Sequence, residues 1–396
     1  MVKKHWILGH LNDVIDSLVA GVSVNSGEDD ASGNFFILKT SAISKGKLNL
    51  SEKKPVLPRE VARLKCSLRQ ETILISRMNT PELVGECAYV PCDDPRIYLP
   101  DRIWQTNFKK DVDVSAKWLN YLLSSKKYRS LIQNCATGTS NSMKNISKEQ
   151  LLGLEILYPS FREQTSIAEA LSDVDSLISS LQKLIEKKKA IKQGAMQELL
   201  TGKKRLPGFS GKRKRKKLGN YIKFEVGFPF KSQYFNSQHI GLRLIKNRDL
   251  KSDDQVYYTT EDVSSEYIVN NGDILVGMDG DFTPCIWRKG VALLNQRVGR
   301  IGAFGMDLLF SYYLLQQPLQ ELQIGTGATT VKHLSHFDVE ELELTFPEEI
   351  KEQQAIAQAL SDMDNDIEQL EKKLSKYQQI KQGMMQDLLT GRIRLV

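Results

Sequence analysis

The chain contains the same long segment twice. REQTSIAEALSDVDSLISSLQKLIEKKKAIKQGAMQELLTGKKRL runs from Arg162 to Leu206, and KEQQAIAQALSDMDNDIEQLEKKLSKYQQIKQGMMQDLLTGRIRL runs from Lys351 to Leu395. The copies align without a gap, and about 25 of the aligned positions are identical. A solenoid has a shorter period that repeats many times. The fold must therefore accommodate one long unit used twice, with different sequence between the copies.

Apolar residues recur in each copy at alternating intervals of three and four, the spacing of a helix that pairs with another helix. These residues are Leu171, Val174, Ile178, Leu181 and Ile185 in the first copy and Leu360, Met363, Ile367, Leu370 and Leu374 in the second. Gly202 and Gly391 follow the two patterns, where left-handed C-terminal stops are expected. We predict two long helices that pair with each other, and the residues alone allow a parallel or an antiparallel pair.

Each predicted helix also contains an internal glycine, Gly194 or Gly383, in the motif KQG. Glycine inside a helix costs about 1 kcal/mol relative to alanine. One interpretation is that the helix tolerates this cost. The presence of the glycine in both copies favours another, a point where another backbone comes close. That backbone could belong to the other helix or to a second subunit.

The rest of the chain forms two divergent blocks with traces of a common plan. FILKTSAI (Phe36 to Ile43) parallels RLIKNRDL (Arg243 to Leu250), ETILISR parallels GDILVGM, and LPDRI parallels LNQRV. Short apolar runs read as strands, and SAKWLNYLLSSKKYRSLI and MDLLFSYYLLQQPLQEL read as helices. We predict two small α+β domains, residues 1–160 and 208–349, and two spacer-helix segments, residues 161–207 and 350–396.

Composition excludes several classes of protein. The chain has 396 residues, 41% of them hydrophobic and 26% charged, which is typical of globular proteins. No apolar run approaches the roughly 18 residues of a membrane-spanning helix, so no membrane association is expected. The five cysteines form no CxxC pair, which indicates reduced thiols and a cytoplasmic location. A net charge of +7 permits nucleic-acid binding without requiring it.

Catalytic motifs are missing from the sequence. There is no GxxxxGK[ST] nucleotide loop and no Asn-Pro-Pro-aromatic tetrapeptide of an amino-methyltransferase. His333 and His336 lack the further ligands of a metal set, so no metal site is predicted. The basic run KRKRKK, Lys212 to Lys217, is interpreted either as a solvated connector or as a clamp on the phosphate backbone of DNA.

The two helical copies resemble those of the specificity subunits of type I restriction-modification systems. Each copy ends in LLTG, follows a proline and an EQ pair (Pro159, Glu163 and Gln164; Pro347, Glu352 and Gln353), and has SDxD in its first turns. The resemblance covers essentially the full chain. It implies an α+β protein with two mixed target-recognition domains, separated by two long helices in an antiparallel coiled coil with pseudo-twofold symmetry.

The resemblance also implies a function and a set of partners. Each domain would read one half of a split, asymmetric site in double-stranded DNA, and the paired helices would set the spacing. The chain itself would be non-catalytic and hold no cofactor. Two methyltransferase subunits would bring S-adenosylmethionine and methylate adenines flipped out of the stack, and restriction subunits would bring ATP and Mg. The helix from Leu171 to Ile191 would span about 30 Å, close to one turn of B-DNA.

The candidate DNA-reading residues are polar residues at matched positions of the two blocks. Basic side chains, amides and hydroxyls can reach base edges or phosphates. The set consists of Lys39, Thr40, Ser41, Thr139, Ser140 and Lys144 in the first block and Lys246, Asn247, Arg248, Thr329 and Lys332 in the second. Two alternatives stay open at this point: a coiled-coil scaffold without a nucleic-acid role, and a stand-alone DNA-binding regulator.

Overall fold

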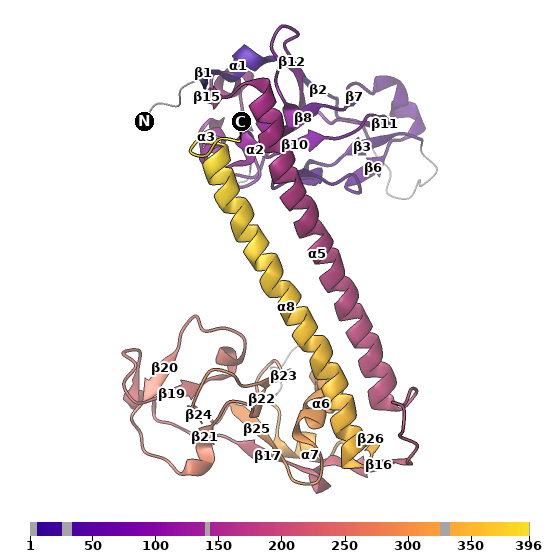
Figure 1. The fold of residues 1–396 in the computed structure, drawn as a ribbon, viewed down its shortest axis with the longest axis vertical. Helices are drawn as coiled ribbons and strands as arrows, with labels where there is room; N and C mark the ends of the chain where they lie inside the picture. The colour runs from indigo at the N-terminus through magenta and orange to yellow at the C-terminus, as the bar shows by residue number, and fades with distance from the viewer. Residues whose placement is uncertain (1–5, 26–33, 139–142, 325–332, 396) are drawn as a thin grey trace. The chain divides into compact units, whose positions relative to one another are not determined.

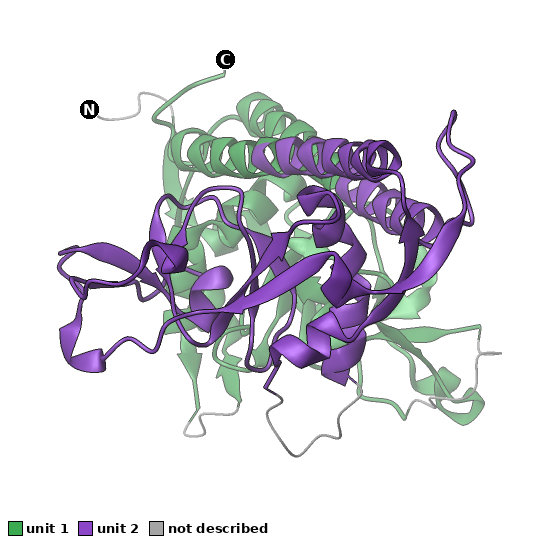
Figure 2. Cartoon of the chain, turned by 90° about the horizontal axis from the view of Figure 1, so that it is seen from below, with its two compact units in different colours: residues 1–182, 373–396 green, residues 183–372 purple. Residues whose placement is uncertain are grey.

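The computed structural model of the protein describes residues 6–25, 34–138, 143–324 and 333–395. The chain divides into two compact units (Figure 2). Unit 1 comprises Met1–Gln182 and Lys373–Val396, and unit 2 comprises Lys183–Lys372. Each unit therefore contains one block of strands and short helices and a part of each long helix.

Unit 1 is built around two four-stranded sheets (Figure 1). The first, in the order β10-β8-β12-β2, is fully antiparallel. The second, in the order β6-β3-β11-β7, has one parallel pair, β3 with β11. Smaller pairings are β1-β15, β13-β14-β9 and the hairpin β4-β5. The bounds are β1 Ile7–His10, β2 Ile15–Ala20, β3 Phe36–Leu38, β4 Ile43–Ser44, β5 Lys47–Leu48, β6 Lys53–Pro55, β7 Ser67–Leu68, β8 Thr72–Ser76, β9 Met78–Asn79, β10 Cys87–Val90, β11 Asp94–Tyr98, β12 Ile103–Phe108, β13 Ala136–Thr137, β14 Lys144–Ile146 and β15 Glu155–Tyr158.

Unit 2 repeats this plan. Its antiparallel sheet has the order β17-β25-β22-β23, and its mixed sheet has the order β18-β20-β19-β24-β21 with β19 parallel to β24. The two-stranded pair is β16-β26. The bounds are β16 Arg213–Lys217, β17 Ile222–Val226, β18 Phe235–Asn236, β19 Leu242–Ile245, β20 Tyr257–Thr259, β21 Ile268–Val269, β22 Ile274–Gly277, β23 Pro284–Ile286, β24 Ala292–Leu294, β25 Val298–Ala303 and β26 Glu343–Pro347.

The short helices also correspond between the units. A 3₁₀ turn follows an inner strand of each mixed sheet, β3 in unit 1 and β19 in unit 2, and helices follow the antiparallel sheet. In unit 1 the helices are α1 Leu11–Val14, η1 Thr40–Ala42, η2 Pro58–Arg63, α2 Ala116–Ser124, α3 Lys126–Asn134 and α4 Lys148–Leu152. In unit 2 they are η3 Leu218–Asn220, η4 Ser232–Tyr234, η5 Asn247–Leu250, η6 Ser265–Tyr267, α6 Leu308–Ile324 and α7 His336–Glu340. The parallels predicted from FILKTSAI and RLIKNRDL are thus confirmed as β3-η1 and β19-η5.

Two long helices carry the repeated segment, as predicted. Helix α5 covers Phe161–Thr201 and helix α8 covers Ile350–Leu388. Gly202 has a φ of +80° and Gly391 a φ of +66°, so both are the left-handed stops that the sequence indicates. Beyond α8 the backbone N–H of Arg392 donates to the carbonyl of Asp387 (2.9 Å), which satisfies a carbonyl of the last turn.

The helices run antiparallel within each unit. In unit 1, Asp175 near the start of α5 pairs with Lys381 near the end of α8 at 2.8 Å. In unit 2, Lys192 near the end of α5 pairs with Asp364 near the start of α8 at 2.5 Å. The orientation that the sequence left open, and the family resemblance implied, is therefore antiparallel.

All ten residues of the predicted helix-pairing stripe are buried or half-buried. Leu171 lies in the core of unit 1 with Trp118 of α2 and Leu388 of α8. Leu360 lies in the core of unit 2 with Phe310 of α6 and Leu199 of α5. The long helices thus contribute to the core of each unit, so the domains are anchored to the helices by apolar burial.

Within the described ranges, no helix is both long and apolar enough to span a membrane, and no group of His, Cys, Asp or Glu is arranged to hold a metal ion. The five cysteines carry free thiols.

Candidate DNA and partner interfaces

The EQ pair at the start of each long helix is buried in both units. Gln164 accepts a hydrogen bond from the backbone N–H of Ser115 (2.9 Å), and its amide donates to the carbonyl of Pro159 (2.9 Å). Gln353 repeats this with the N–H of Asp307 and the carbonyl of Pro347, both at 2.8 Å. The repeated Pro-EQ motif therefore joins each helix start to the turn before its domain helix.

The neighbouring glutamate of each pair is a buried anion with arginine partners. Glu352, 1% exposed, binds Arg205 at 2.6 Å and Arg213 at 3.1 Å. Glu163, 0% exposed, accepts from Arg394 at 2.7 Å and from the indole N–H of Trp6 at 3.3 Å. A buried carboxylate is tolerated only when it is paired in this way.

A cluster of tyrosine, aspartate and lysine then ties each domain helix to both long helices. In unit 1 the hydroxyl of Tyr121 donates to Asp175 (2.9 Å), which also binds Lys381 of α8. In unit 2 the hydroxyl of Tyr313 donates to Asp364 (2.8 Å), which also binds Lys192 of α5. Burial, followed by the neighbouring aspartate, raises the pKa of each tyrosine, which keeps its hydroxyl as a donor.

Two corresponding grooves lie between a long helix and a domain helix. The groove in unit 1 has a volume of about 750 Å³, and that in unit 2 about 530 Å³. The long helices, with the turn after α8, contribute five identical residues at matched positions: Gln382, Met385, Gln386, Leu389 and Thr390 in unit 1, and Gln193, Met196, Gln197, Leu200 and Thr201 in unit 2. The domain sides differ, with Lys126 and Lys127 in unit 1 and Pro318 and Glu321 in unit 2.

The glycines of the KQG motif adjoin these grooves. Gly194 and Gly383 are exposed, and a Cβ added to either would meet no described atom within 4 Å. Close approach of the other helix is therefore wrong. A surface shared with a second subunit stays a prediction, and so does a glycine that the helix merely tolerates.

The 3₁₀ turns after β3 and β19 carry the first candidate DNA-reading residues. Lys39 lies 3.6 Å from Glu52, whose carboxylate also accepts from the hydroxyl of Ser41 (2.8 Å). Thr40 begins η1 between them. The side-chain hydrogen bond from Ser41, followed by the charge of Lys39, lowers the pKa of Glu52. These side chains are organised at the surface, and their role in reading DNA stays a prediction.

In the matching turn of unit 2, η5, the side chains of Lys246 and Asn247 have partners in other parts of the unit. The ammonium of Lys246 lies 3.4 Å from the ring centroid of Tyr257, and burial followed by nearby Arg248 lowers the pKa of this lysine. Asn247 donates to the carbonyl of Asp279 (2.6 Å). Arg248 has a side chain that is 52% exposed. Lys246 and Asn247 thus have partners within the protein, whereas the side chain of Arg248 is more exposed. The role of all three residues in reading DNA stays a prediction.

Asp279 links the η5 turn to the segment that follows the second group of candidate residues in unit 2. Its carboxylate lies 2.9 Å from Nδ1 of His333 and 3.3 Å from Arg297. The structure therefore brings the η5 turn together with the residues that follow the second candidate loop of unit 2. Thr329 and Lys332 of that loop, and Thr139 and Ser140 in unit 1, lie outside the described residues. Lys144 belongs to β14, and its ammonium donates to the carbonyl of Gly138 (2.6 Å).

The basic run is a strand and not a connector, which corrects one prediction. Residues Arg213–Lys217 form β16 and pair along their whole length with β26. Glutamates neutralise the cations: Lys216 with Glu348 at 2.6 Å, Arg215 with Glu343 at 3.0 Å, and Lys217 with Glu341 at 2.5 Å. Each of these three cations already has an anion at the surface, so the phosphate-clamp interpretation stays a prediction.

Sequence reasoning missed the polar junctions that hold the domains on the helices. Trp6, Arg394 and Asp279 gave no signal of their own. The EQ pair did give one, because a polar pair kept in both copies of a diverged repeat indicates a shared buried contact.

Comparison with known proteins finds similarity to the specificity subunits of type I restriction enzymes. The family description "Type I restriction modification DNA specificity domain" matches residues 3–193 and 211–382. The putative type I restriction enzyme MjaX specificity subunit of Methanocaldococcus jannaschii is 25% identical over 422 residues, which cover 100% of this chain and 95% of that protein. The type I restriction enzyme EcoBI specificity subunit of Escherichia coli is 35% identical over 174 residues, which cover 42% of this chain and 36% of that protein.

Solved structures share the fold. The crystal structure of a type I restriction-modification system S subunit from M. genitalium matches with a TM-score of 0.63 at 17% identity, over 97% of this chain and 96% of that one. A chain from a structure titled for the complex assembly and conformational transition of the type I R-M system matches with a TM-score of 0.52 at 13% identity, over 97% of both chains. The scaffold and stand-alone regulator alternatives find no support in these matches.

Proposed function

The chain belongs to the family of type I restriction-modification DNA specificity domains, and from this premise we propose that it is the non-catalytic DNA-recognition subunit of such a complex. Each domain reads one half of a bipartite, asymmetric DNA site, and the paired helices set the spacing. The observation that carries the proposal is the duplication itself. The junctions between helix and domain are repeated almost residue for residue, whereas the η1 and η5 turns differ, as two readers of unlike half-sites require.

The partners follow from the two grooves with matched helix residues. A surface that occurs twice with the same Gln, Met, Leu and Thr side chains suits two copies of one partner. We assign these grooves to two methyltransferase subunits, and the exposed glycines beside them allow a partner backbone to approach closely. Restriction subunits then bind to the complex that this chain forms with the methyltransferase subunits.

The chemistry resides in those partners. S-adenosylmethionine is bound by the methyltransferase subunits, and ATP and Mg²⁺ by the restriction subunits, while this chain holds none of them. A complex that acts on cellular and incoming DNA operates in the cytoplasm, where the free thiols of this chain remain reduced.

A matched insertion tests the spacing role. One heptad is inserted after Gln182 in α5 and one after Lys372 in α8, the last residues before the chain passes from one unit to the other, so that the helix pairs inside each unit are kept. Seven residues lengthen a helix by about 10 Å, which corresponds to about three base pairs of DNA. Methylome sequencing should show both half-sites unchanged and a spacer about three base pairs longer. An unchanged spacer contradicts the proposal.

Reciprocal substitutions test the reading role. Arg248→Ala should relax one position of the half-site read by unit 2, at a cost of about 1–3 kcal/mol in discrimination if the arginine contacts a base edge. Ser41→Ala should act only on the half-site read by unit 1. Each variant serves as the control for the other in methylome sequencing. A variant that changes the half-site of the other unit, or both half-sites, contradicts the assignment.

A further inference from the structure

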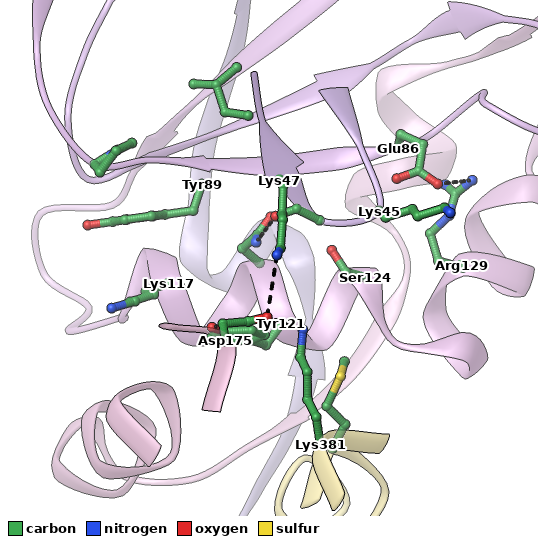
Figure 3. A pocket seen from close by; sticks show the side chains of 15 residues that line it. Lys45, Lys47, Glu86, Tyr89, Lys117, Tyr121, Ser124, Arg129, Asp175 and Lys381 are labelled. Atoms are coloured by element: carbon green, nitrogen blue, oxygen red, sulfur yellow. Dashed lines mark hydrogen bonds and ion pairs between the residues drawn. The ribbon is translucent and has the colours of Figure 1, made fainter. Parts of the chain in front are cut away.

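The polar clusters of the two units are of two kinds. The junction cluster is the same in both, and in unit 1 its residues Tyr121, Asp175 and Lys381 line a cavity together with the β4-β5 hairpin, α2 and α3 (Figure 3). The carboxylates of this cavity already have cations: Lys381 lies 2.8 Å from Asp175, and Arg129 lies 3.2 Å from Glu86. A cluster that both units share cannot distinguish two half-sites, so recognition depends on clusters of the second kind.

A cluster of the second kind lies at the end of an inner strand of each antiparallel sheet, β8 in unit 1 and β22 in unit 2. The matched hydrogen bonds run from the N–H of Arg77 to the carbonyl of Arg102 (3.0 Å) and from the N–H of Ile146 to the carbonyl of Arg77 (3.0 Å) in unit 1, and from the N–H of Met278 to the carbonyl of Arg297 (3.1 Å) and from the N–H of Leu334 to the carbonyl of Met278 (2.8 Å) in unit 2. The same backbone framework therefore positions the side chains of both units.

The side chains on this framework differ between the units. Unit 1 presents Met78 opposite Asn145, whereas unit 2 presents Asp279 opposite His333. DNA sequence is read by the donors, acceptors and apolar groups that side chains offer to base edges. A common backbone that carries different side chains is therefore suited to reading two unlike half-sites.

In unit 2 the aspartate orients an arginine and a histidine. Oδ1 of Asp279 lies 2.9 Å from Nδ1 of His333 and 3.3 Å from the guanidinium of Arg297. The side chains of Arg297 and His333 are 55% and 50% exposed, and that of Asp279 is 30% exposed. The amide of Asn247 in η5 donates to the backbone carbonyl of Asp279 (2.6 Å), which joins this cluster to the first candidate turn. An exposed arginine, Arg102, also occupies the matching position of unit 1, without an aspartate opposite.

The carboxylate of Asp279 favours a base over a phosphate as the group that Arg297 contacts. A phosphate at this arginine would also lie near the carboxylate, and like charges repel. A base edge is neutral: guanine accepts two hydrogen bonds from an arginine, and the amino group of cytosine donates to a carboxylate. An exposed ion pair contributes only about 0–1 kcal/mol, so the guanidinium stays available to a base.

We infer that Asp279, Arg297 and His333 determine part of the half-site of unit 2, an inference that rests on the proposed function. Arg297 makes a bidentate contact with a guanine. Asp279 is a positioning residue that holds the guanidinium and the imidazole in place. Unit 1 has Met78 where this carboxylate lies, so the corresponding position of its half-site is read differently.

The test is adenine methylome sequencing of cells that express the full chain with its methyltransferase subunits. Arg297→Ala should relax discrimination about tenfold at one position of the half-site read by unit 2. Arg297→Lys should relax the same position, because lysine keeps the charge but lacks the planar fork that matches guanine. Asp279→Met combined with His333→Asn, which copies unit 1, should change that position while the half-site of unit 1 and the melting temperature of the chain stay the same. A purely structural role would instead lower methylation at every sequence alike.

Binding of the full chain to a duplex that carries the identified site, measured against salt concentration, separates a base contact from a phosphate contact. Arg297→Lys should keep the salt slope of the unchanged chain. If Arg297→Ala relaxes no position, weakens binding equally for all sequences and lowers the slope by about 1, the arginine contacts a phosphate and the inference is overturned.

The control is Lys223→Gln, which removes an exposed lysine of β17 outside the cluster and should leave both half-sites unchanged. If the unchanged chain gives a bipartite methylation motif and the cluster variants do not alter it, the inference is overturned and the proposed function stands. If the unchanged chain gives no bipartite motif, the proposed function fails and the inference fails with it.

Discussion

The two units share the junctions that join domain to helix, and they differ in their surface turns and at one position beside the shared tyrosine. Both join a domain to the long helices through a buried EQ pair, a glutamate with arginine, and a tyrosine-aspartate-lysine cluster. They differ in the turns after β3 and β19, and in Asn120 of unit 1 against Tyr312 of unit 2. Similarity is retained where each domain joins the long helices, and it is lost in the surface turns, as the proposed reading of two unlike half-sites requires.

The shared junctions are themselves not equally strong. The arginines that bind Glu352 come from within unit 2, and the side chain of Arg213 is only 7% exposed. The arginine that binds Glu163 is Arg394, near the C-terminal end of the chain, with a side chain that is 37% exposed. Solvent screens the second pair more than the first. The two glutamate–arginine pairs occupy matching positions, and we expect the pair in unit 2 to stabilise its unit more than the pair in unit 1.

The largest effect is expected from the buried glutamates. Glu352→Gln leaves Arg213 buried without its anion, and such a loss costs about 3–5 kcal/mol of folding free energy. Glu163→Gln is the matched control and should cost less, because Arg394 can turn to water. Urea unfolding of the two variants measures the difference. If Glu163→Gln is as damaging as Glu352→Gln, the two junctions are equal and the comparison fails.

The tyrosines should show the opposite behaviour, with nearly equal losses in the two units. Tyr121→Phe and Tyr313→Phe each remove a hydrogen bond to an aspartate, worth about 1.5–3 kcal/mol. Each tyrosine has a raised pKa in the folded chain, so its stabilisation is complete below the unfolded pKa of about 10 and is lost as the pH rises further.

Unfolding measured between pH 8 and 11 checks this second prediction. The unchanged chain should lose up to about 1.4 kcal/mol per pH unit for each such tyrosine above pH 10. Each phenylalanine variant should lose part of that slope. If one variant loses as much stability per pH unit as the unchanged chain, the tyrosine that it replaces does not have a raised pKa in the folded chain, and the two clusters are not equivalent.

A smaller and opposite pair of effects is expected at the exposed glycines. Gly194→Ala and Gly383→Ala should each stabilise the isolated chain by about 0.5–1 kcal/mol, because alanine favours the helix and no described atom obstructs its Cβ. Both should weaken binding of the methyltransferase subunit. Calorimetric titration of that subunit into each variant measures the second effect. Stabilisation without weaker binding would remove these glycines from the partner surface.

The smallest effect is expected at β16, whose counterpart at the start of unit 1, β1, carries no basic run. Lys214→Gln combined with Arg215→Gln should change stability by only about 0.5 kcal/mol, as is usual for surface substitutions. The salt dependence of DNA affinity should stay the same, because glutamates already pair these cations. A salt slope lower by about 1 for each substitution would support the phosphate clamp.

The sequence by itself determined the two helices, their ends at Gly202 and Gly391, and the matched strands β8 and β22. These features depend on helical and strand periodicity and on glycine in left-handed positions, which are local properties of the chain. Because the segment is duplicated, each pattern of apolar residues and glycine occurs twice, and the second copy supports the prediction made from the first. Local structure could therefore be predicted for both copies together.

Only the tertiary structure decided how charges and cavities are arranged. The run KRKRKK looks free in the sequence, yet its partners Glu341, Glu343 and Glu348 lie more than a hundred residues away. The cavity of unit 1 is likewise assembled from a hairpin, two domain helices and two long helices. Ion pairs and cavities depend on which distant segments pack together, and no periodicity along the chain contains that information.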